Sequence, residues 1–439
     1  MVTKGYTLIE LVIVMAVFLI LLMISASAFE NVIKISTNST KSAQSQMEGI
    51  VGLEILRKDL NAAGYGLPWK FQTTPDPVKY LEADLGADKP VKGLSADDFN
   101  DAPANSSAGI PLPGIPRAVA HGTVPATQDP IYKRTGMNSN PGSDYLVIKS
   151  VVTAFNNSVG KWGYVVYSGN QTTNNSYIAK SNSAEDLAAN EVVVTQTNMF
   201  SGVSPALHVL AMQDSAHFSY RLGIKDTAGH FVPVHSNYKP SGSLVDRYGA
   251  RINNEEMIAY AINNVSSGST ETIRMPFNRA DYFVMRPTGT SMPSRCNPGT
   301  GILYKAVVIN SMTAGGGGFT LYPLLDCVGD MQVIFDMQDP TDANKTMTVD
   351  TLATLTAGDI RTRLKAIRVY LLVQEGGKDN SYSYLYTNSN NVITVSDDRT
   401  PSLGRTFKES DMENYFGNEW RKYRWKVYTV VGQPYNLLY

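Results

Sequence analysis

The sequence predicts an α+β protein in which a long N-terminal α-helix, membrane-spanning in its first part, precedes a large β-rich domain. Three observations predict this fold class. The side chains from Tyr6 to Phe29 are predominantly apolar, and residues 30–63 contain no proline and become amphipathic. The remaining residues form short β-type runs separated by loops rich in proline, glycine and asparagine.

A single acidic residue lies in the apolar segment. No polar side chain occurs from Leu11 to Ile24, and Glu10 is the only charged residue between Tyr6 and Phe29. About 20 helical residues cross the hydrocarbon core of a bilayer, and a carboxylate within it costs roughly 2.5–3.5 kcal/mol, so Glu10 is a candidate functional residue. Glu10 follows Tyr6 by one helical turn. Cleavage after Gly5 would give Tyr6 a positively charged α-amino group that can pair with a carboxylate and that neighbouring chains in a polymer can share.

Two simpler interpretations of this segment remain open. A secretory signal peptide also has a basic start and an apolar core, and Ala26-Ser27-Ala28 offers a cleavage site for it. The apolar core of such a peptide normally has about 7–15 residues, which is shorter than the segment here. A plain membrane anchor explains the length of the segment but neither Glu10 nor the junction at Gly5.

The helix is expected to run from Tyr6 to Ala63. Apolar residues recur beyond Phe29 at steps of three and four, with charged residues between the later ones; they are Val32, Ile35, Met47, Ile50, Leu53, Leu56 and Leu60. Residues 36–45 are polar on all sides and should be exposed. Glycines at 64 and 66 and a proline at 68 then end the helix. We therefore expect a leader at 1–5, a transmembrane part at 6–29 and an amphipathic part at 30–63.

Residues 64–439 are expected to form the β-rich domain. They exceed the roughly 250–300 residues at which one core stops growing, which favours one large domain with insertions or two subdomains. Residues 69–141 are rich in proline and predict a loop-rich insertion or irregular chain wrapped on the domain. Strands are predicted at 145–152, 162–167, 191–195, 218–222, 282–285, 302–309, 319–322, 331–335, 366–373 and 424–431. Residues 263–268 are a candidate internal boundary or a hairpin tip.

The charge distribution argues against a general nucleic-acid binder. The chain has 38 basic and 39 acidic residues, a net charge of −1. Residues 421–426 form a local basic run with interleaved aromatic residues, which is typical of nucleic-acid or anionic-lipid contacts. Alternation along a strand explains the same run without a ligand, because one face would pack Trp425 and the other would be solvated or paired with carboxylates. The 24 tyrosines fit either a sugar-binding adhesive surface or ordinary sheet packing.

Both cysteines, Cys296 and Cys327, follow the apolar segment. Lys4 precedes that segment and indicates a cytoplasmic N-terminus, so the cysteines are expected on the oxidising, periplasmic side. A disulfide between them would stabilise the fold by about 3–4 kcal/mol, and two buried free thiols are the alternative.

The residues that could carry chemistry do not form a recognisable site. The sequence contains no serine nucleophile elbow, Walker loop, zincin helix or Cys-x-x-Cys pair, and His230 and His235 have no evident third ligand. Two acidic clusters could hold Ca²⁺, although neither has EF-hand spacing and solvated turns are the alternative; they are Asp97, Asp98 and Asp101, and Asp336, Asp339 and Asp342. We therefore expect no catalytic residue, no metal site and no cofactor.

The N-terminus resembles the class III signal of type IV pilins. The resemblance rests on Lys4, on the run Gly5-Tyr6-Thr7-Leu8-Ile9-Glu10 and on the apolar helix that follows. It implies cleavage after Gly5 by a prepilin peptidase and N-methylation of Tyr6, where most members have phenylalanine. It also implies that Leu8, Ile9 and Glu10 take part in filament assembly.

Four further segments resemble PilW-type minor pilins. They are residues 53–66, 324–333, 364–373 and 423–431, and the second of them reads Leu324-Leu325-Asp326-Cys327-Val328-Gly329-Asp330-Met331-Gln332-Val333. The resemblance implies a single-pass inner-membrane protein with a pilin-like periplasmic domain that primes pilus assembly or forms the pilus tip. Its expected partners are other minor and major pilins, prepilin peptidase, the inner-membrane assembly platform and membrane lipid, but no nucleic acid. The alternatives are a pseudopilin of type II secretion and a membrane-anchored periplasmic ligand-binding protein or enzyme.

Overall fold

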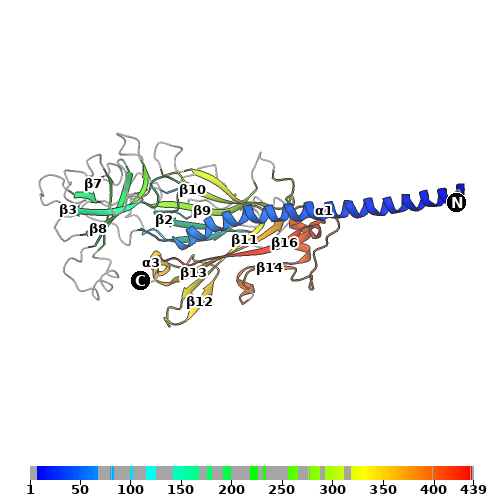
Figure 1. Cartoon of the computed structure of the whole chain (residues 1–439). Helices are drawn as coiled ribbons and strands as arrows, with labels where there is room; N and C mark the ends of the chain where they lie inside the picture. Colours follow the sequence, from blue (N-terminus) through cyan, green and yellow to red (C-terminus); the bar gives the residue numbers. More distant parts are fainter. Residues whose placement is uncertain are drawn as a thin grey trace.

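The computed structural model shows one long helix and an antiparallel β-rich domain (Figure 1). It describes residues 7–67, 80, 82–83, 99–101, 115–124, 142–167, 176–179, 191–198, 218–225, 231–233, 256–264, 275, 277–286, 292–310, 318–397, 399–435 and 437. The predicted α+β fold class is confirmed. The first part of helix α1 (Leu8–Asn61) extends away from the domain, and its last part lies along the domain.

The end of α1 is fixed by the turn that follows it. Gly64 and Gly66 have positive φ angles of 81° and 69°, which glycine adopts readily. The backbone N–H of Gly64 donates to the carbonyl oxygen of Lys149, so the turn is joined directly to a central strand. The C-terminal tail closes over the same point, because the Tyr435 N–H donates to the Asn61 carbonyl oxygen and Leu437 is buried.

The main sheet has eight strands, and every pairing in it is antiparallel. Its order is β1-β2-β9-β10-β11-β13-β16, and β12 pairs with β11. The strands are β1 (Val119–Thr123), β2 (Asp144–Ser150), β9 (Asn278–Met285), β10 (Gly301–Val308), β11 (Phe319–Gln338), β12 (Thr346–Val349), β13 (Leu364–Glu375) and β16 (Arg424–Gly432). Helices α3 (Ala357–Arg363) and α4 (Glu409–Phe416), the short helices η4 (Pro401–Leu403) and η5 (Trp420–Lys422), and a hairpin of β14 (Ile393–Val395) and β15 (Arg405–Phe407) complete this part.

Strand β11 corrects the prediction of separate strands at 319–322 and 331–335. The structure has one strand of 20 residues whose first half pairs with β10 and whose second half pairs with β13. The change of partner occurs at an irregularity between Val328 and Asp330, next to Cys327, which has φ 56°. A residue with positive φ and a bulge bend a strand without ending it. The bend interrupts the alternation of side chains in the sequence, so two separate strands were predicted.

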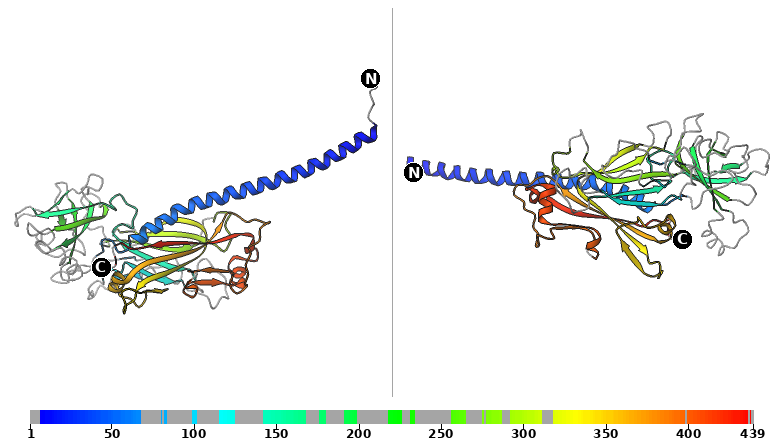
Figure 2. Two further views of the ribbon diagram at one scale, coloured as in Figure 1. Left: turned by 60° about the horizontal axis from the view of Figure 1, so that its bottom comes forward. Right: turned by 180° about the vertical axis from the view of Figure 1, so that it is seen from behind.

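A second, six-stranded sheet is inserted between β2 and β9. Its order is β4-β3-β8-β5-β6-β7, with β3 (Trp162–Tyr167), β4 (Ser176–Ala179), β5 (Glu191–Asn198), β6 (Phe218–Lys225), β7 (Phe231–Pro233) and β8 (Glu256–Asn264). Because Ser150 of β2 pairs with Asn278 of β9, the chain leaves the main sheet and returns to it at one place. The second sheet lies at the end of the domain farthest from the start of α1 (Figure 2). The predicted boundary at 263–268 coincides with the end of β8, and residues 265–268 lie outside the described residues.

Helix α1 packs on the face formed by β11, β13 and β16. Leu56, Leu60 and Ala63 are buried there in the main core, at the three- and four-residue steps that the sequence predicts. Gly52 permits the close approach, since a Cβ atom at this position would lie 2.1 Å from the carbonyl oxygen of Leu324. The helix and the domain are therefore one packed unit from Gly49 onward.

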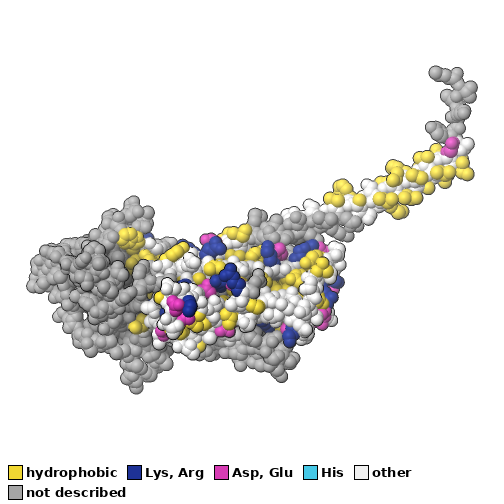
Figure 3. Space-filling model, turned by 90° about the horizontal axis from the view of Figure 1, so that it is seen from below, with side chains coloured by type: hydrophobic (Ala, Val, Ile, Leu, Met, Phe, Trp, Pro, Cys, Tyr) yellow, Lys and Arg dark blue, Asp and Glu magenta, His cyan; other side chains and the backbone are white. Residues whose placement is uncertain are grey.

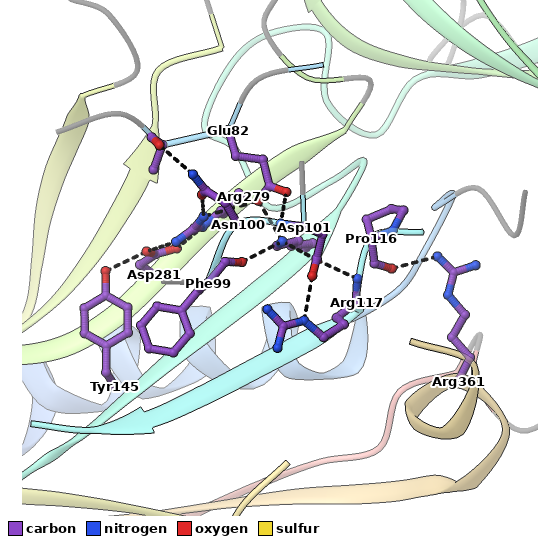
Figure 4. A network of polar contacts seen from close by, with 12 residues as sticks. Glu82, Phe99, Asn100, Asp101, Pro116, Arg117, Tyr145, Arg279, Asp281 and Arg361 are labelled. Carbon is purple, nitrogen blue, oxygen red and sulfur yellow. Dashed lines mark hydrogen bonds and ion pairs between the residues drawn. The ribbon is translucent and has the colours of Figure 1, made fainter. Parts of the chain in front are cut away.

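A buried ionic network holds parts of the proline-rich region against β2 and β9 (Figure 4). Lys149 Nζ lies 2.6 Å from Glu82 Oε2 and 2.5 Å from Asp101 Oδ2. Arg279 binds Asp281 through two hydrogen bonds of 2.7 and 2.8 Å and also contacts Glu82 at 3.2 Å. Charges taken out of water need partners of opposite sign, so this network fixes residues 82 and 99–101 on the sheet.

Candidate functional site

The carboxylate of Glu10 caps the start of α1. Its Oε2 atom accepts hydrogen bonds from the backbone N–H of Thr7 at 3.0 Å and from the Thr7 hydroxyl at 3.1 Å. The Thr7 hydroxyl in turn accepts from the Glu10 N–H at 3.4 Å, which completes a capping box. Glu10 therefore lies at the positive end of the helix dipole, within one turn of the predicted new N-terminus. Gly5 and Tyr6 lie outside the described residues.

The apolar side chains on both sides of Glu10 in the sequence are exposed in the structure. Leu8 is 85% exposed and Ile9 is 69% exposed, and the large apolar residues up to Ile24 are at least half exposed. The segment Leu8–Phe29 has 22 residues and a mean hydropathy of 3.0, and among the described residues it is the one helix that could span a membrane. Figure 3 shows this part of α1 as a rod with abundant apolar surface outside the domain. Such a surface requires lipid or a partner helix.

The sequence did not single out a second acidic residue of α1. Asp59 lies on the buried face between Leu56 and Leu60, and its Oδ2 atom contacts Lys305 Nζ at 2.5 Å. Tyr282 donates its hydroxyl proton to the same oxygen at 2.6 Å. The spacing of Asp59 among the apolar residues of the helix is the signal that could have indicated a buried carboxylate.

The structure joins Cys296 and Cys327 in a disulfide, with Cα atoms 5.0 Å apart. The bond connects the loop before β10 to the bend of β11. On the other side of the loop, the side-chain carbonyl of Gln374 accepts from the Asn297 N–H at 2.6 Å. The disulfide therefore fixes the loop at the point where β11 changes partners.

Replacing both cysteines by serine is expected to lower the free energy of unfolding by about 3–4 kcal/mol, because the open chain regains the entropy of a loop of 31 residues. Chemical denaturation of the oxidised protein and of the double variant measures the difference. The reduced wild-type protein is the matched control and should resemble the variant. Equal stability of all three samples would contradict this contribution.

The basic run at 421–426 is paired with carboxylates. Arg421 contacts Glu409, Lys422 lies 2.8 Å from Glu419, Arg424 lies 2.8 Å from Asp379, and Lys426 lies 3.2 Å from Glu375. Trp425 packs inward against Phe416, with ring centroids 4.4 Å apart. The alternating-strand interpretation thus accounts for the run, since each cation has a partner within the chain.

The acidic clusters considered for Ca²⁺ are separated or engaged in local contacts. Asp101 belongs to the buried ionic network, and Asp336 pairs with Arg368 at 2.6 Å. Asp339 accepts from the hydroxyl of Thr341, which lies in the turn after β11. Asp97 and Asp98, like His230 and His235, lie outside the described residues. The described part of the chain contains no group of three His, Cys, Asp or Glu side chains that could hold a metal ion.

A further cluster of buried polar side chains lies between β2 and the second half of β11. Asp330 accepts from the Ser143 hydroxyl at 2.8 Å and contacts Arg405 at 3.3 Å. Asp144 accepts from the Val333 N–H at 2.8 Å. Burial raises the pKa of Asp330 to about 6, although the Arg405 charge opposes this shift. These side-chain contacts therefore connect β2 and β11, which are not hydrogen-bonded neighbours in the sheet.

The pKa of Asp330 predicts a stability that falls as the pH rises. The carboxyl binds its proton more tightly in the folded state, so its contribution is largest below the unfolded pKa and is lost between about pH 4 and pH 6. The loss is on the order of 3 kcal/mol. The unfolding free energy of Asp330→Asn relative to wild type should therefore increase over this interval in a pH series of denaturant titrations. Asp339→Asn is the exposed control and should lack this rise, and a constant difference for Asp330→Asn would contradict the assignment.

Comparison with known families decides how the N-terminus is interpreted. Residues 1–26 match the family model described as the prokaryotic N-terminal methylation motif. The N-terminus is that of a type IV pilin-like prepilin. No curated protein and no solved structure matches the chain. The prepilin motif implies processing by a prepilin peptidase and interaction with the pilus machinery, and together with the apolar helix it fits an inner-membrane anchor.

Glu10 belongs both to the matched prepilin motif and to the first turn of α1. The motif covers the leader and most of the exposed apolar helix, and the structure places the Glu10 carboxylate at the first turn of that helix. The roles of Gly5 and Tyr6 in processing, and of Leu8, Ile9 and Glu10 in assembly, stay predictions.

Proposed function

We propose that this chain is a minor pilin of PilW type, which inserts in the inner membrane and primes pilus assembly or forms the tip complex of a type IV pilus. The observation that carries the proposal is a lone carboxylate at the start of an exposed apolar helix. Lateral packing would bury this helix against neighbouring pilins, and Glu10 would pair with the amino terminus of a neighbour.

The positions of the PilW-like segments support the minor-pilin assignment. The four segments fall on the last part of α1, on β11, on β13 and on β16. In the structure α1 contacts each of these three strands, so the four segments form one continuous unit. The resemblance to PilW-type minor pilins therefore covers the strands on which α1 packs. It does not include the inserted second sheet.

The size of the domain supports a position at the tip. The second sheet extends the molecule at the end opposite the start of α1 (Figure 1). In a shaft of repeated subunits such an extension would meet the subunits stacked above it, whereas at the tip it meets solvent. On this proposal the large domain faces the periplasm before assembly and the cell surface afterwards.

Deletion of the coding sequence tests the proposal. We expect few or no surface pili in the deletion strain, and we expect the complemented protein in sheared pili at far below the amount of the major subunit. Amounts equal to the major subunit would contradict a minor role. Normal piliation with lost protein secretion would instead favour the alternative, a pseudopilin of type II secretion.

A further inference from the structure

The contact between α1 and the sheet contains a buried carboxyl group and a buried amine. The Asp59 side chain is 5% exposed and the Lys305 side chain is 1% exposed, and Nζ lies 2.5 Å from Oδ2. The ring of Phe155 covers the amine, with its centroid 4.0 Å from Nζ. The hydroxyl of Tyr282 also donates a hydrogen bond to Oδ2, at 2.6 Å.

Burial drives this pair toward its neutral form. It raises the pKa of the Asp59 carboxyl and lowers the pKa of the Lys305 ammonium, and the attraction between the two charges offsets each shift only in part. Transfer of one proton from Nζ to Oδ2 over 2.5 Å then leaves an amine beside a carboxylic acid. A desolvated, neutral lysine amine is a nucleophile. Because the fold holds the Asp59 carboxyl group next to it, the reaction needs no encounter between separate molecules.

We propose that Asp59 and Lys305 are a modification site at which an amide bond forms between Cγ of Asp59 and Nζ of Lys305. The N–C bond forms as one C–O bond of the carboxyl group breaks. Two protons of the original ammonium leave with that oxygen as water, and the third stays on the amide nitrogen. The reaction is charge-neutral and needs no oxidant, no reductant and no activating group.

Tyr282 assists the departure of the oxygen. Its hydroxyl donates to Oδ2, the atom that also contacts the amine, and so makes this oxygen a better leaving group as the C–O bond breaks. Exclusion of bulk water disfavours the reverse reaction, since hydrolysis requires a water molecule at the amide carbon.

The ionic network around Lys149 provides a comparison within the same chain. Lys149 Nζ is as close to Asp101 Oδ2, at 2.5 Å, and its side chain is fully buried. Here, although burial alone would raise it, the adjacent charges of Lys149 and Arg117 hold the pKa of the Asp101 carboxyl below its usual range. The carboxylate therefore stays ionised, and this pair remains an ion pair.

The amide bond would connect α1 directly to β10, near the centre of the main sheet. A pull on the helix would then pass from Asp59 into the sheet without loading the turn at 62–67. The bond depends on the local chemistry of the folded domain, so it forms whether or not the chain assembles into a pilus. Its test is therefore independent of the proposed function.

Mass spectrometry of the full-length mature protein, extracted from membranes in detergent, tests the proposal. After reduction and alkylation, the intact mass of the wild type should be lower by one water molecule than the mass of its linear chain, and proteolysis should yield a branched peptide joining Asp59 to Lys305. The Lys305→Arg variant should have its full linear mass whether or not it folds. Lys149→Arg is the matched control and should retain the loss of water.

The Tyr282→Phe variant tests whether the Tyr282 hydroxyl assists formation of the amide bond or only packs beside the pair. It should fold with the pair in place but accumulate the branched peptide more slowly after synthesis than the wild type. Recovery of wild-type Asp59 and Lys305 only in linear peptides, with no loss of water in the intact mass, would overturn the proposal. Loss of water that persists in Lys305→Arg would also overturn it, because the water would then come from another site.

Discussion

Glu10→Gln is expected to leave the protein in the inner membrane while its recovery in sheared pili falls by about thirtyfold or more. Removing one partner of a buried charge pair costs about 2–5 kcal/mol, and 2 kcal/mol corresponds to that factor. Glutamine also serves as the third residue of a capping box, so the first turn of α1 should be unchanged. Quantitative immunoblots of membrane and pilus fractions measure the ratio.

The matched control for Glu10 is Glu54→Gln. Glu54 lies on the same helix, exposed and paired with Arg57 at 3.7 Å, and exposed pairs of this kind contribute little. This variant should reach pili at the wild-type level. Equal recovery of Glu10→Gln and Glu54→Gln would show that assembly does not use the charge of Glu10.

Arg279→Met is expected to destabilise the domain by about 3–5 kcal/mol. The side chain of Arg279 is fully buried and binds Asp281, Glu82 and Asn100, so its removal leaves the buried Asp281 carboxylate without its cation. The domain should also lose the attachment of residues 82 and 100 to β9. Denaturant unfolding of the full chain in detergent, followed by tryptophan fluorescence, measures the change.

Arg117→Met is the control for Arg279. Arg117 belongs to the same network through Asp101, at 2.6 Å, but its side chain is 24% exposed. Its replacement should cost about 1 kcal/mol or less, as for pairs that water can partly solvate. A similar cost for both variants would contradict the importance of complete burial.

The helix and several of the strands could be predicted because their signals are local. The apolar run, the spacing of Leu56 and Leu60 and the glycines at 64 and 66 together locate α1 closely. Strand β3 was predicted at its observed bounds. Strand β1 was missed because Val119–Thr123 lies within a proline-rich region and owes its conformation to pairing with β2.

The contacts that join distant segments could not be predicted. Lys149 of β2 contacts Glu82 and Asp101 only because the fold packs these residues, which come much earlier in the chain, against β2. Asp59 and Lys305 are likewise far apart in sequence and meet through the packing of α1 on the sheet. Glu10 was accessible to sequence analysis because its significance depends on the apolar residues directly around it, whereas a buried ion pair depends on topology.

The mature N-terminus tests the central claim most directly. The protein is isolated from membranes of cells with and without prepilin peptidase, and its N-terminal peptide is sequenced by mass spectrometry. The account predicts that the chain begins at Tyr6, methylated or not, only when the peptidase is present. A chain that begins at Phe29 would contradict it, because a secretory signal peptidase would then have removed Glu10 together with the apolar helix.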